Sequence, residues 1–337
     1  MKKILILLSV FFIFSCSGKD IQDYKVFYAL DTVCRISLYD QGTDEIYKAI
    51  EQELLLTENL FNSHITNSEI SKINSEAGKN PVIVSPETFN LVQKSIELWK
   101  STEGAFNPAL GPVISLWKIG SENPVVPDSD TIAEKLSLCN PDQIIINNEN
   151  LSIFLNTPGM ALDLGGIAKG FCAEQIKNIC ISEGITKGII DLGGNIILIG
   201  EKKPGYPWTA GIRTPEENTF DAAISFSCKD KTIVTSGIYE RFFIKDGVLY
   251  HHIFNPETGF PVENRLLSVS VISENSITAD ALSTAIFVMG LEKGMEYVKK
   301  IPGTEAVFIT KENEIFTTAG IRENIIFVNP AYKIKDF

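Results

Sequence analysis

Histidine and basic side chains are scarce in this sequence. Histidine occurs three times in 337 residues, and 30 lysines and arginines stand against 42 aspartates and glutamates, which gives a formal net charge of −12 at pH 7. A protein that binds the phosphate backbone of DNA or RNA needs a basic surface. The charge balance therefore argues against nucleic acid as a partner. The composition is otherwise that of an ordinary globular protein, with 44% apolar and 21% charged residues.

The sequence also lacks the cysteine spacing of a zinc site or of a disulfide framework. Six cysteines are present, and no two of them form a CxxC pair. Apart from Cys16 in the N-terminal segment, an odd number of widely spaced cysteines remains. We expect these to be buried as small apolar residues, and the sequence leaves open whether one disulfide forms. They are Cys34, Cys139, Cys172, Cys180 and Cys228.

The longest apolar run lies at the N-terminus. Two lysines precede the run 4–14, which is too short to span a bilayer and is typical of a signal peptide. The Ser15-Cys16 pair that follows resembles a bacterial lipoprotein signal. We predict a signal peptide over 1–15 and a lipidated tether over 16–24, which would anchor the protein at the extracytoplasmic (periplasmic) face of the bacterial inner membrane. A plain secretory peptide with an incidental cysteine is the alternative.

The remaining chain, residues 25–337, has no repeat, no low-complexity segment and no long Pro/Gly linker. Apolar residues at helical spacing predict helices over 44–61, 85–99, 167–183 and 278–300. Helices and strands without regular βαβ alternation predict an α+β fold, a single domain with largely antiparallel sheets and flanking helices. The expected strands cover residues 26–39, 144–147, 188–199, 232–235, 249–254, 267–272 and 307–310.

Two glycine pairs follow an Asp-Leu dipeptide, in ALDLGGIAKG (161–170) and in IIDLGGN (189–195). In the first segment, glycines at a helix start expose main-chain N–H groups that favour anions, and Lys169 adds a positive charge suited to phosphate. Neither segment is a Walker A or a GxGxxG sequence. A tight strand-to-helix turn explains the first equally well. A strand-end turn is favoured for the second, although Asn195 could contact a polar group of a ligand.

Asp280 and Thr284 are four residues apart in a predicted helix and therefore share one face. A carboxylate and a hydroxyl are hard oxygen ligands that suit Mg²⁺ beside phosphates, although an isolated pair more often caps or back-bonds to its own helix. The segment TSGIYERFF (235–243) carries Glu240 and Arg241, which either bracket a ligand or form a surface ion pair of little consequence. From this segment alone, the ion pair is favoured.

Two of the three histidines are adjacent, in YHHIFNPETGFP (250–261). Neighbouring side chains on a strand point to opposite faces, so His251 and His252 cannot both line one pocket if this segment is extended. This geometry argues against a two-histidine metal site. One imidazole is expected to face the site as a general base, and the other packs or meets solvent. A buried, hydrogen-bonded structural histidine is the usual alternative.

Taken together and in this order, the segments resemble the FAD:protein FMN transferase family, also called ApbE, over nearly the whole chain from about residue 27. The resemblance implies an α+β flavin transferase that binds its substrate FAD with Mg²⁺. It would transfer FMN to a threonine, sometimes serine, hydroxyl of a partner protein and release AMP. The segments that carry the resemblance are SEISKIN (68–74), GAFNPALGPVISLW (104–117), DLGGIAKG, DLGGN, SGIYERFF, YHHIFNPETGFPV and ADALSTAIFVMG.

The resemblance also implies roles for individual residues and partners. His252 would be the catalytic base, and Mg²⁺ would be bound by Asp280, Thr284 and the main-chain carbonyl of Gly166. The expected acceptors are flavoprotein subunits of redox-driven ion pumps and other extracytoplasmic electron-transfer proteins. The residues implied in FAD binding are Leu30, His64, Ala105, Phe106, Asn107, Asp163, Lys169 and Phe254.

Two positions depart from the family pattern, because Asp31 stands where glycine is usual and Asn255 where aspartate is common. These departures concern substrate fit and leave the expected catalytic groups intact.

One alternative with the same fold is a Mg²⁺-dependent FAD pyrophosphatase that yields FMN and AMP. Another alternative is a non-catalytic periplasmic FAD-binding lipoprotein. The combination of His252, Asp280 and Lys169 argues against it, because binding alone needs no base.

Overall fold

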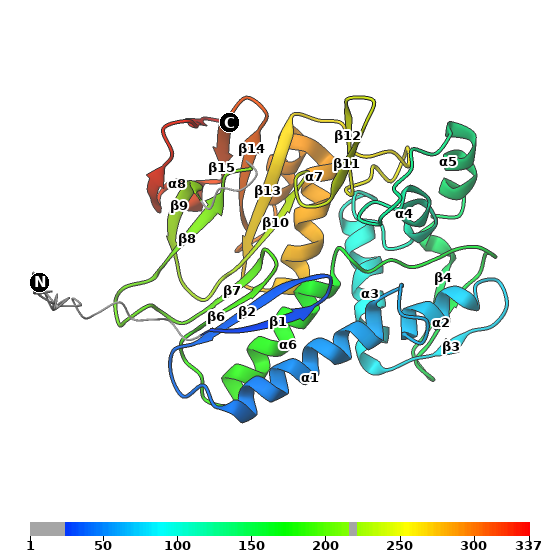
Figure 1. Cartoon of the computed structure of the whole chain (residues 1–337), viewed down its shortest axis with the longest axis horizontal. Coiled ribbons are helices and arrows are strands. Elements are labelled where there is room, and N and C mark those ends of the chain that lie inside the picture. The colour runs from blue at the N-terminus through cyan, green and yellow to red at the C-terminus, as the bar shows by residue number, and fades with distance from the viewer. Residues whose placement is uncertain (1–23, 216–220) are drawn as a thin grey trace, which may run out of the picture.

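The computed structural model describes residues 24–215 and 221–337, and a nine-stranded sheet forms its centre (Figure 1). Neighbouring strands are antiparallel, except that β15 and β17 are parallel. In order across the sheet, the strands are β1 (Lys25–Ala29), β2 (Thr32–Leu38), β6 (Gly188–Leu192), β7 (Asn195–Ile199), β10 (Thr232–Gly237), β13 (Leu266–Ser273), β14 (Glu305–Thr310), β15 (Glu314–Thr317) and β17 (Lys333–Lys335).

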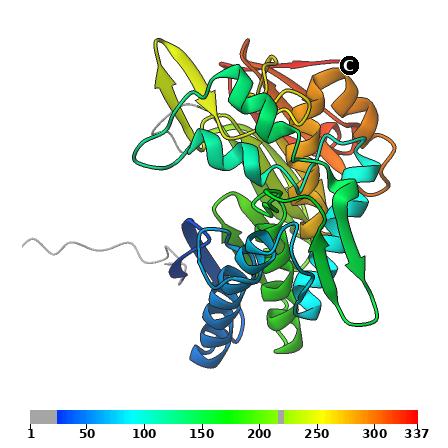
Figure 2. The same cartoon turned by 90° about the vertical axis from the view of Figure 1, so that its right-hand side faces the viewer.

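Three long helices cover one face of this sheet: α1 (Asp44–Phe61), α6 (Ala168–Ser182) and α7 (Ser276–Val298). Helices α1 and α6 run side by side near β2 and β6, and α7 packs against β10 and β13 (Figures 1 and 2). Apolar residues at helical spacing explain why these segments are helices. The buried residues of α1, for example, include Ile46, Ile50 and Leu54.

A second sheet covers part of the opposite face, with β8 (Trp208–Arg213), β9 (Ala222–Cys228) and β16 (Ile325–Val328), and the short helix α8 (Ala319–Arg322) lies at its side. Alternation along the central strands supplies both cores. In β14, Phe308 packs in the core beneath the helices, whereas Val307 and Ile309 pack against the second sheet. The central sheet is therefore apolar on both faces.

Further elements, among them the 16-residue helix α3, complete the molecule on the side of α7 (Figure 1). Trp117 at the end of α4 joins two of them, because its indole N–H donates to the Gly259 carbonyl at 3.0 Å and its ring packs against Tyr250 and Phe254. These contacts fix the segment that carries the adjacent histidines. The elements are α2 (Glu69–Ser75), β3 (Val82–Ile83), α3 (Pro86–Ser101), α4 (Gly111–Trp117), α5 (Ser129–Leu136), the 3₁₀ turn η1 (Pro141–Gln143), β4 (Ile144–Asn147), β5 (Ser152–Leu155), β11 (Phe242–Lys245) and β12 (Val248–His251).

The α+β prediction with largely antiparallel sheets is confirmed, as are the four predicted helices. The single strand predicted over 26–39 is wrong, because β1 and β2 form a hairpin. Its turn residues Leu30 and Asp31 have φ of 54° and 55°, a conformation that favours glycine, asparagine or aspartate, so Asp31 suits the turn whereas Leu30 does not indicate one. The predicted run 188–199 is likewise two strands, joined at Gly193 and Gly194.

Cysteine behaves as expected where the structure describes it. Cys34, Cys139, Cys172 and Cys180 are buried and Cys228 is partly exposed, and all five are free thiols. Burial raises the pKa of each thiol to about 11 or 12. Across residues 24–215 and 221–337, no helix is both long and apolar enough to cross a membrane. The predicted signal peptide, and most of the tether with Cys16, lie outside the described residues.

Helices α6 and α7 approach each other most closely at Gly170. A Cβ atom added there would lie 2.4 Å from the carbonyl oxygen of Ser276 and 2.7 Å from the Cβ of Asp280. Both neighbours belong to the first turns of α7, so neither helix can move without disturbing the other. Only glycine fits at this contact.

We predict that Gly170→Ala lowers the free energy of unfolding by about 1–3 kcal/mol, because the added methyl group forces the two helices apart. Urea denaturation of the purified protein measures this change. Ser182→Ala, at the exposed end of the same helix, is the control and should stay within about 0.5 kcal/mol of the wild type. Wild-type stability of Gly170→Ala would contradict the close helix contact.

Candidate active site

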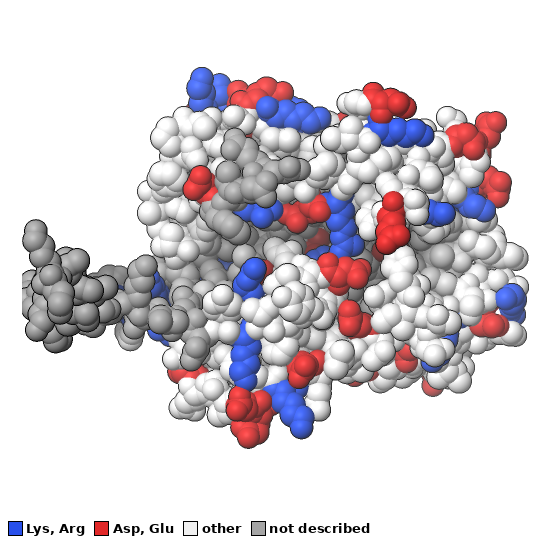
Figure 3. Space-filling view, viewed as in Figure 1, with Lys and Arg blue, Asp and Glu red and all other residues white. Residues whose placement is uncertain are grey.

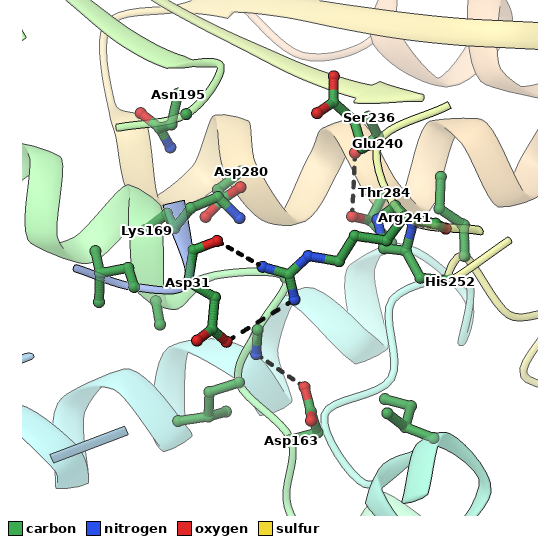
Figure 4. A pocket seen from close by; sticks show the side chains of 18 of the residues that line it. Asp31, Asp163, Lys169, Asn195, Ser236, Glu240, Arg241, His252, Asp280 and Thr284 are labelled. Carbon is green, nitrogen blue, oxygen red and sulfur yellow. Dashed lines mark hydrogen bonds and ion pairs between the residues drawn. The ribbon is translucent and has the colours of Figure 1, made fainter. Parts of the chain in front are cut away.

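One pocket gathers the segments on which the sequence analysis depends. A cavity of about 460 Å³ opens between the β1–β2 turn, the start of α6, the first turns of α7 and the segment after β12 (Figure 4). Its volume suits a small-molecule ligand. Every described residue predicted to bind FAD, to bind Mg²⁺ or to act as the base lines this pocket: Leu30, His64, Ala105, Phe106, Asn107, Asp163, Gly166, Lys169, His252, Phe254, Asp280 and Thr284.

Asp280 is the buried carboxylate of the pocket. It lies on α7 with 4% of its surface exposed, and its Oδ2 accepts a hydrogen bond from the Gly170 N–H at 2.7 Å. Burial raises the pKa of Asp280, and the nearby positive charge of Lys169 opposes that shift. A buried carboxylate of this kind is stabilised in its charged form by a cation.

Thr284 lies one helical turn after Asp280 on the same helix and lines the same pocket. Its Oγ1 is 3.3 Å from the Ser236 hydroxyl of β10, and a Cβ added to Gly166 would lie 3.6 Å from it. The loop before α6 therefore passes close to the Thr284 hydroxyl. These contacts bring the carboxylate, the hydroxyl and the glycine loop to one end of the pocket.

The chemistry of this donor set fits Mg²⁺. A carboxylate, a hydroxyl and a main-chain carbonyl are all hard oxygen donors, and Mg²⁺ commonly uses one or two carboxylates together with substrate phosphates. Within the described part of the chain, no group of three or more His, Cys, Asp or Glu side chains is arranged to hold a metal ion. The pocket thus offers oxygen donors for Mg²⁺, and the described residues that line it include no cluster of histidine and cysteine ligands of the kind typical of zinc.

The two adjacent histidines face different surroundings, as expected from their sequence. His252 lines the pocket, whereas His251 is 5% exposed and packs away from it. The Nε2–H of His251 donates to the Val262 carbonyl at 3.0 Å, and its Nδ1 accepts from the Ile253 N–H at 3.2 Å. His251 is therefore the structural histidine, and it holds the turn that presents its neighbour.

His252 is held as a neutral imidazole with one free nitrogen. Its Nδ1–H donates to the Arg241 carbonyl at 3.1 Å, which leaves the lone pair of Nε2 available. Burial in the pocket, together with the nearby positive charges of Arg241 and Lys169, lowers the pKa of His252 from 6.5 to about 4. A neutral, oriented imidazole of this kind can accept a proton over the whole physiological pH range.

Lys169 and Asp163 come from the glycine loop and the helix that follows it. Lys169 lies in the first turn of α6, where its charge acts on both Asp280 and His252. Asp163 Oδ1 accepts from the Gly165 N–H at 2.9 Å, so this carboxylate stabilises the loop as well as lining the cavity. The tight strand-to-helix turn and the lining of the pocket are thus both features of this segment.

The remaining predicted residues form the walls and the mouth. Phe106 is buried, and Phe254 packs on Trp117 with ring centroids 5.8 Å apart. The side-chain amide of Asn107 donates to the Cys139 carbonyl at 3.0 Å and accepts from the Ala109 N–H at 2.8 Å, so this amide holds its own loop. His64 is exposed at the mouth.

Further polar residues outside the predicted binding set also line the pocket, among them Asp31, Asn195, Ser236, Glu240 and Arg241. The Arg241 guanidinium reaches the β1–β2 turn, where its Nη2 is 3.5 Å from the Asp31 carbonyl oxygen and its Nη1 is 4.0 Å from the carboxylate (Figure 4). Glu240 pairs with Arg213 at 3.2 Å. In the described part of the chain, Glu240 and Arg241 thus pair with Arg213 and Asp31 and not with each other, so the ion pair favoured from sequence is replaced by two others, and both residues line the pocket. Figure 3 shows acidic and basic side chains interleaved on this face around a central hollow.

Known proteins resemble this chain in both sequence and fold. A model of the ApbE family matches residues 30–308. The FAD:protein FMN transferase of Treponema pallidum is 35% identical over 330 residues, covering 92% of this chain and 91% of that protein. The FAD:protein FMN transferase of Klebsiella pneumoniae is 36% identical over 279 residues, covering 83% and 86%.

Solved structures agree with this assignment. The ApbE protein of Thermotoga maritima has a TM-score of 0.83 at 30% identity, over 90% of this chain and 99% of that chain. The flavin transferase ApbE from Vibrio cholerae has a TM-score of 0.80 at 27% identity, over 90% and 98%. On the family match, the relatives and the shared fold, this chain belongs to the ApbE family.

Proposed function

We propose that this protein is a Mg²⁺-dependent FAD:protein FMN transferase. It takes FAD as substrate, transfers FMN to a threonine or serine hydroxyl of a partner flavoprotein and releases AMP. One observation carries the proposal: a single pocket is lined by a neutral His252, by the cation Lys169 and by the oxygen donors around Asp280. The relatives are named FAD:protein FMN transferases, and this name supports the proposed reaction.

Asp280, Thr284 and the Gly166 carbonyl are the residues that would hold Mg²⁺. When bound, the ion would neutralise negative charge on the FAD diphosphate. Lys169 supplies further positive charge at the start of α6, where main-chain N–H groups also favour anions. Leu30, Phe106 and Phe254 would provide apolar surface for the ring systems of FAD. His64, Ala105, Asn107 and Asp163 are the other proposed FAD-binding residues.

His252 is the proposed base. Its Nε2 removes the proton from the acceptor hydroxyl as that oxygen bonds to the FMN phosphorus, and the phosphorus–oxygen bond to AMP breaks. The hydrogen bond from Nδ1–H to the Arg241 carbonyl keeps the free nitrogen unprotonated and oriented. Lys169 stabilises the charge that develops on the phosphate oxygens. The products are an FMN–protein phosphoester and AMP.

We further propose that Cys16 is lipidated after removal of residues 1–15, so that the enzyme is anchored at the periplasmic face of the inner membrane. This proposal is supported by the lysines, the short apolar run and the Ser-Cys pair of the sequence. Acceptors in that compartment would be subunits of redox-driven ion pumps or other electron-transfer flavoproteins. Metabolic labelling with a palmitate analogue, lost in Cys16→Ala, would test the anchor.

Transfer, hydrolysis and simple binding are separated by one assay. The purified protein is incubated with FAD, Mg²⁺ and a candidate acceptor flavoprotein subunit, and the products are resolved on a denaturing gel and by chromatography. Flavin fluorescence that stays on the denatured acceptor, with AMP released and both lost on chelation by EDTA, is the expected result. Free FMN and AMP with no labelled acceptor would instead identify a pyrophosphatase, and unchanged FAD a binding protein.

We predict that His252→Ala lowers the rate of FMN transfer about 10²- to 10⁴-fold, the usual contribution of a general base, and leaves FAD binding within a few-fold of wild type. Initial rates and fluorescence titration measure the two effects. Added imidazole should restore part of the rate. In contrast, His251→Ala should chiefly lower the melting temperature, because it loses two buried hydrogen bonds. Full transfer activity in His252→Ala would reject this base.

The depressed pKa of His252 predicts an unusual pH profile. An ordinary imidazole loses its basic form as the pH falls through about 6.5, whereas this one, with a pKa of about 4, stays neutral until the pH approaches that value. At saturating Mg²⁺, the transfer rate should therefore show no half-loss between about pH 8 and pH 5. Circular dichroism at each pH confirms that the protein remains folded. A midpoint between about pH 6 and 7 would contradict the buried, neutral base.

A further inference from the structure

Asn195 has a buried donor without a partner at the edge of the pocket. The residue is fully buried, and its Oδ1 accepts a hydrogen bond from the Ser276 hydroxyl at 2.9 Å. Its Nδ2 has no hydrogen-bond partner among the residues that the structure describes. A buried N–H group without an acceptor destabilises a protein, so this amide is expected to serve a bound molecule.

The position of Asn195 directs this amide toward the site. Asn195 begins β7 directly after the Gly193-Gly194 turn, and its register partner is Val234 of β10. Directly paired residues of antiparallel strands share a face, and Val234 lies on the face covered by the helices. Asn195 and Val234 both line the pocket. Figure 4 shows the Asn195 side chain close to Asp280 and Lys169.

Ser276 holds the amide in a fixed orientation. Its hydroxyl engages Oδ1, so the amide nitrogen is turned to the other side. Ser276 lies in the first turn of α7, and its carbonyl oxygen and the Asp280 Cβ both pack against Gly170. The donor is thus part of the rigid contact that also positions the carboxylate. A polar group held in this way needs no reorganisation when a ligand arrives.

We propose that Asn195 is an FAD-binding residue whose Nδ2–H donates a hydrogen bond to a phosphate oxygen of the FAD diphosphate. This inference rests on the proposed function, because it takes FAD as the ligand of the pocket. Phosphate is the assigned acceptor because Asn195 is bonded to Ser276 in the first turn of α7, the helix that carries Asp280, and Lys169 lines the same pocket and supplies positive charge there. Asp280 is not the assigned acceptor, because its Oδ2 already accepts a hydrogen bond from the Gly170 N–H.

The test compares FAD affinity and stability in two variants at Asn195. Asn195→Ala removes the amide, and Asn195→Asp keeps an oxygen for Ser276 but removes the donor. We expect both to bind FAD about 10- to 100-fold more weakly in fluorescence titrations, the usual range for a lost hydrogen bond to a charged group. The melting temperature of the ligand-free Ala variant should stay within a few degrees of wild type. The substitution loses the hydrogen bond to Ser276, but it also removes the unsatisfied Nδ2 donor, and the two effects oppose each other. If Asn195→Ala does not fold, the FAD affinity of Asn195→Asp decides whether the inference holds.

Asn264→Ala is the matched control. Asn264 is partly buried and uses both ends of its amide, with Nδ2 donating to the Phe287 carbonyl at 2.8 Å and Oδ1 accepting from the Leu266 N–H at 2.9 Å. It is not among the residues that line the pocket. Its loss should lower the melting temperature and leave FAD affinity unchanged.

Phosphate-free and diphosphate ligands locate the contact. ADP carries the diphosphate and should lose affinity for both Asn195 variants by the same factor as FAD, whereas riboflavin, without phosphate, should lose none. FAD affinity within twofold of wild type in a folded variant would overturn the inference. An equal loss for riboflavin would overturn the phosphate assignment. Absence of transfer by a wild-type protein that binds FAD would instead reject the proposed transferase and leave the binding test intact.

Discussion

The hydrogen bond from the Gly170 N–H to the Asp280 carboxylate joins the two halves of the candidate site. Gly170 belongs to the helix that follows the glycine loop, and Asp280 belongs to the helix that packs on the centre of the sheet. Because Gly170 has no side chain, the two helices come close enough to place Lys169 and the glycine loop beside the carboxylate. Without this contact, the oxygen donors and the cation would have no common pocket.

The same burial gives the acidic and the basic group of the pocket opposite properties. Removal from water raises the pKa of Asp280 and lowers that of His252, because it disfavours the charged form of each. A cation at Asp280 offsets the cost of its charge, whereas His252 needs no partner in its neutral form. One poorly hydrated pocket can thus hold a buried carboxylate and an unprotonated imidazole side by side.

Supporting residues outside the pocket decide how the reactive groups are presented. His251 and Trp117 fix the turn after β12, the first through two buried hydrogen bonds to the main chain and the second through the Gly259 carbonyl. At the mouth, the Asp31–Arg241 pair links the β1–β2 hairpin to the segment before β11.

The sequence by itself determined the α+β class, the long helices, the separation of the two histidines and the family with its pocket residues. Helical periodicity, strand alternation and ordered motifs are local signals that survive in a single sequence. It could not reveal the Leu30-Asp31 turn, because leucine has no turn preference and adopts positive φ only where the β1–β2 pairing requires it. Nor could it reveal the unpartnered amide of Asn195 or the reach of Arg241 to Asp31. These depend on which segments meet in space, and only the packing of the helices on the sheet decided that.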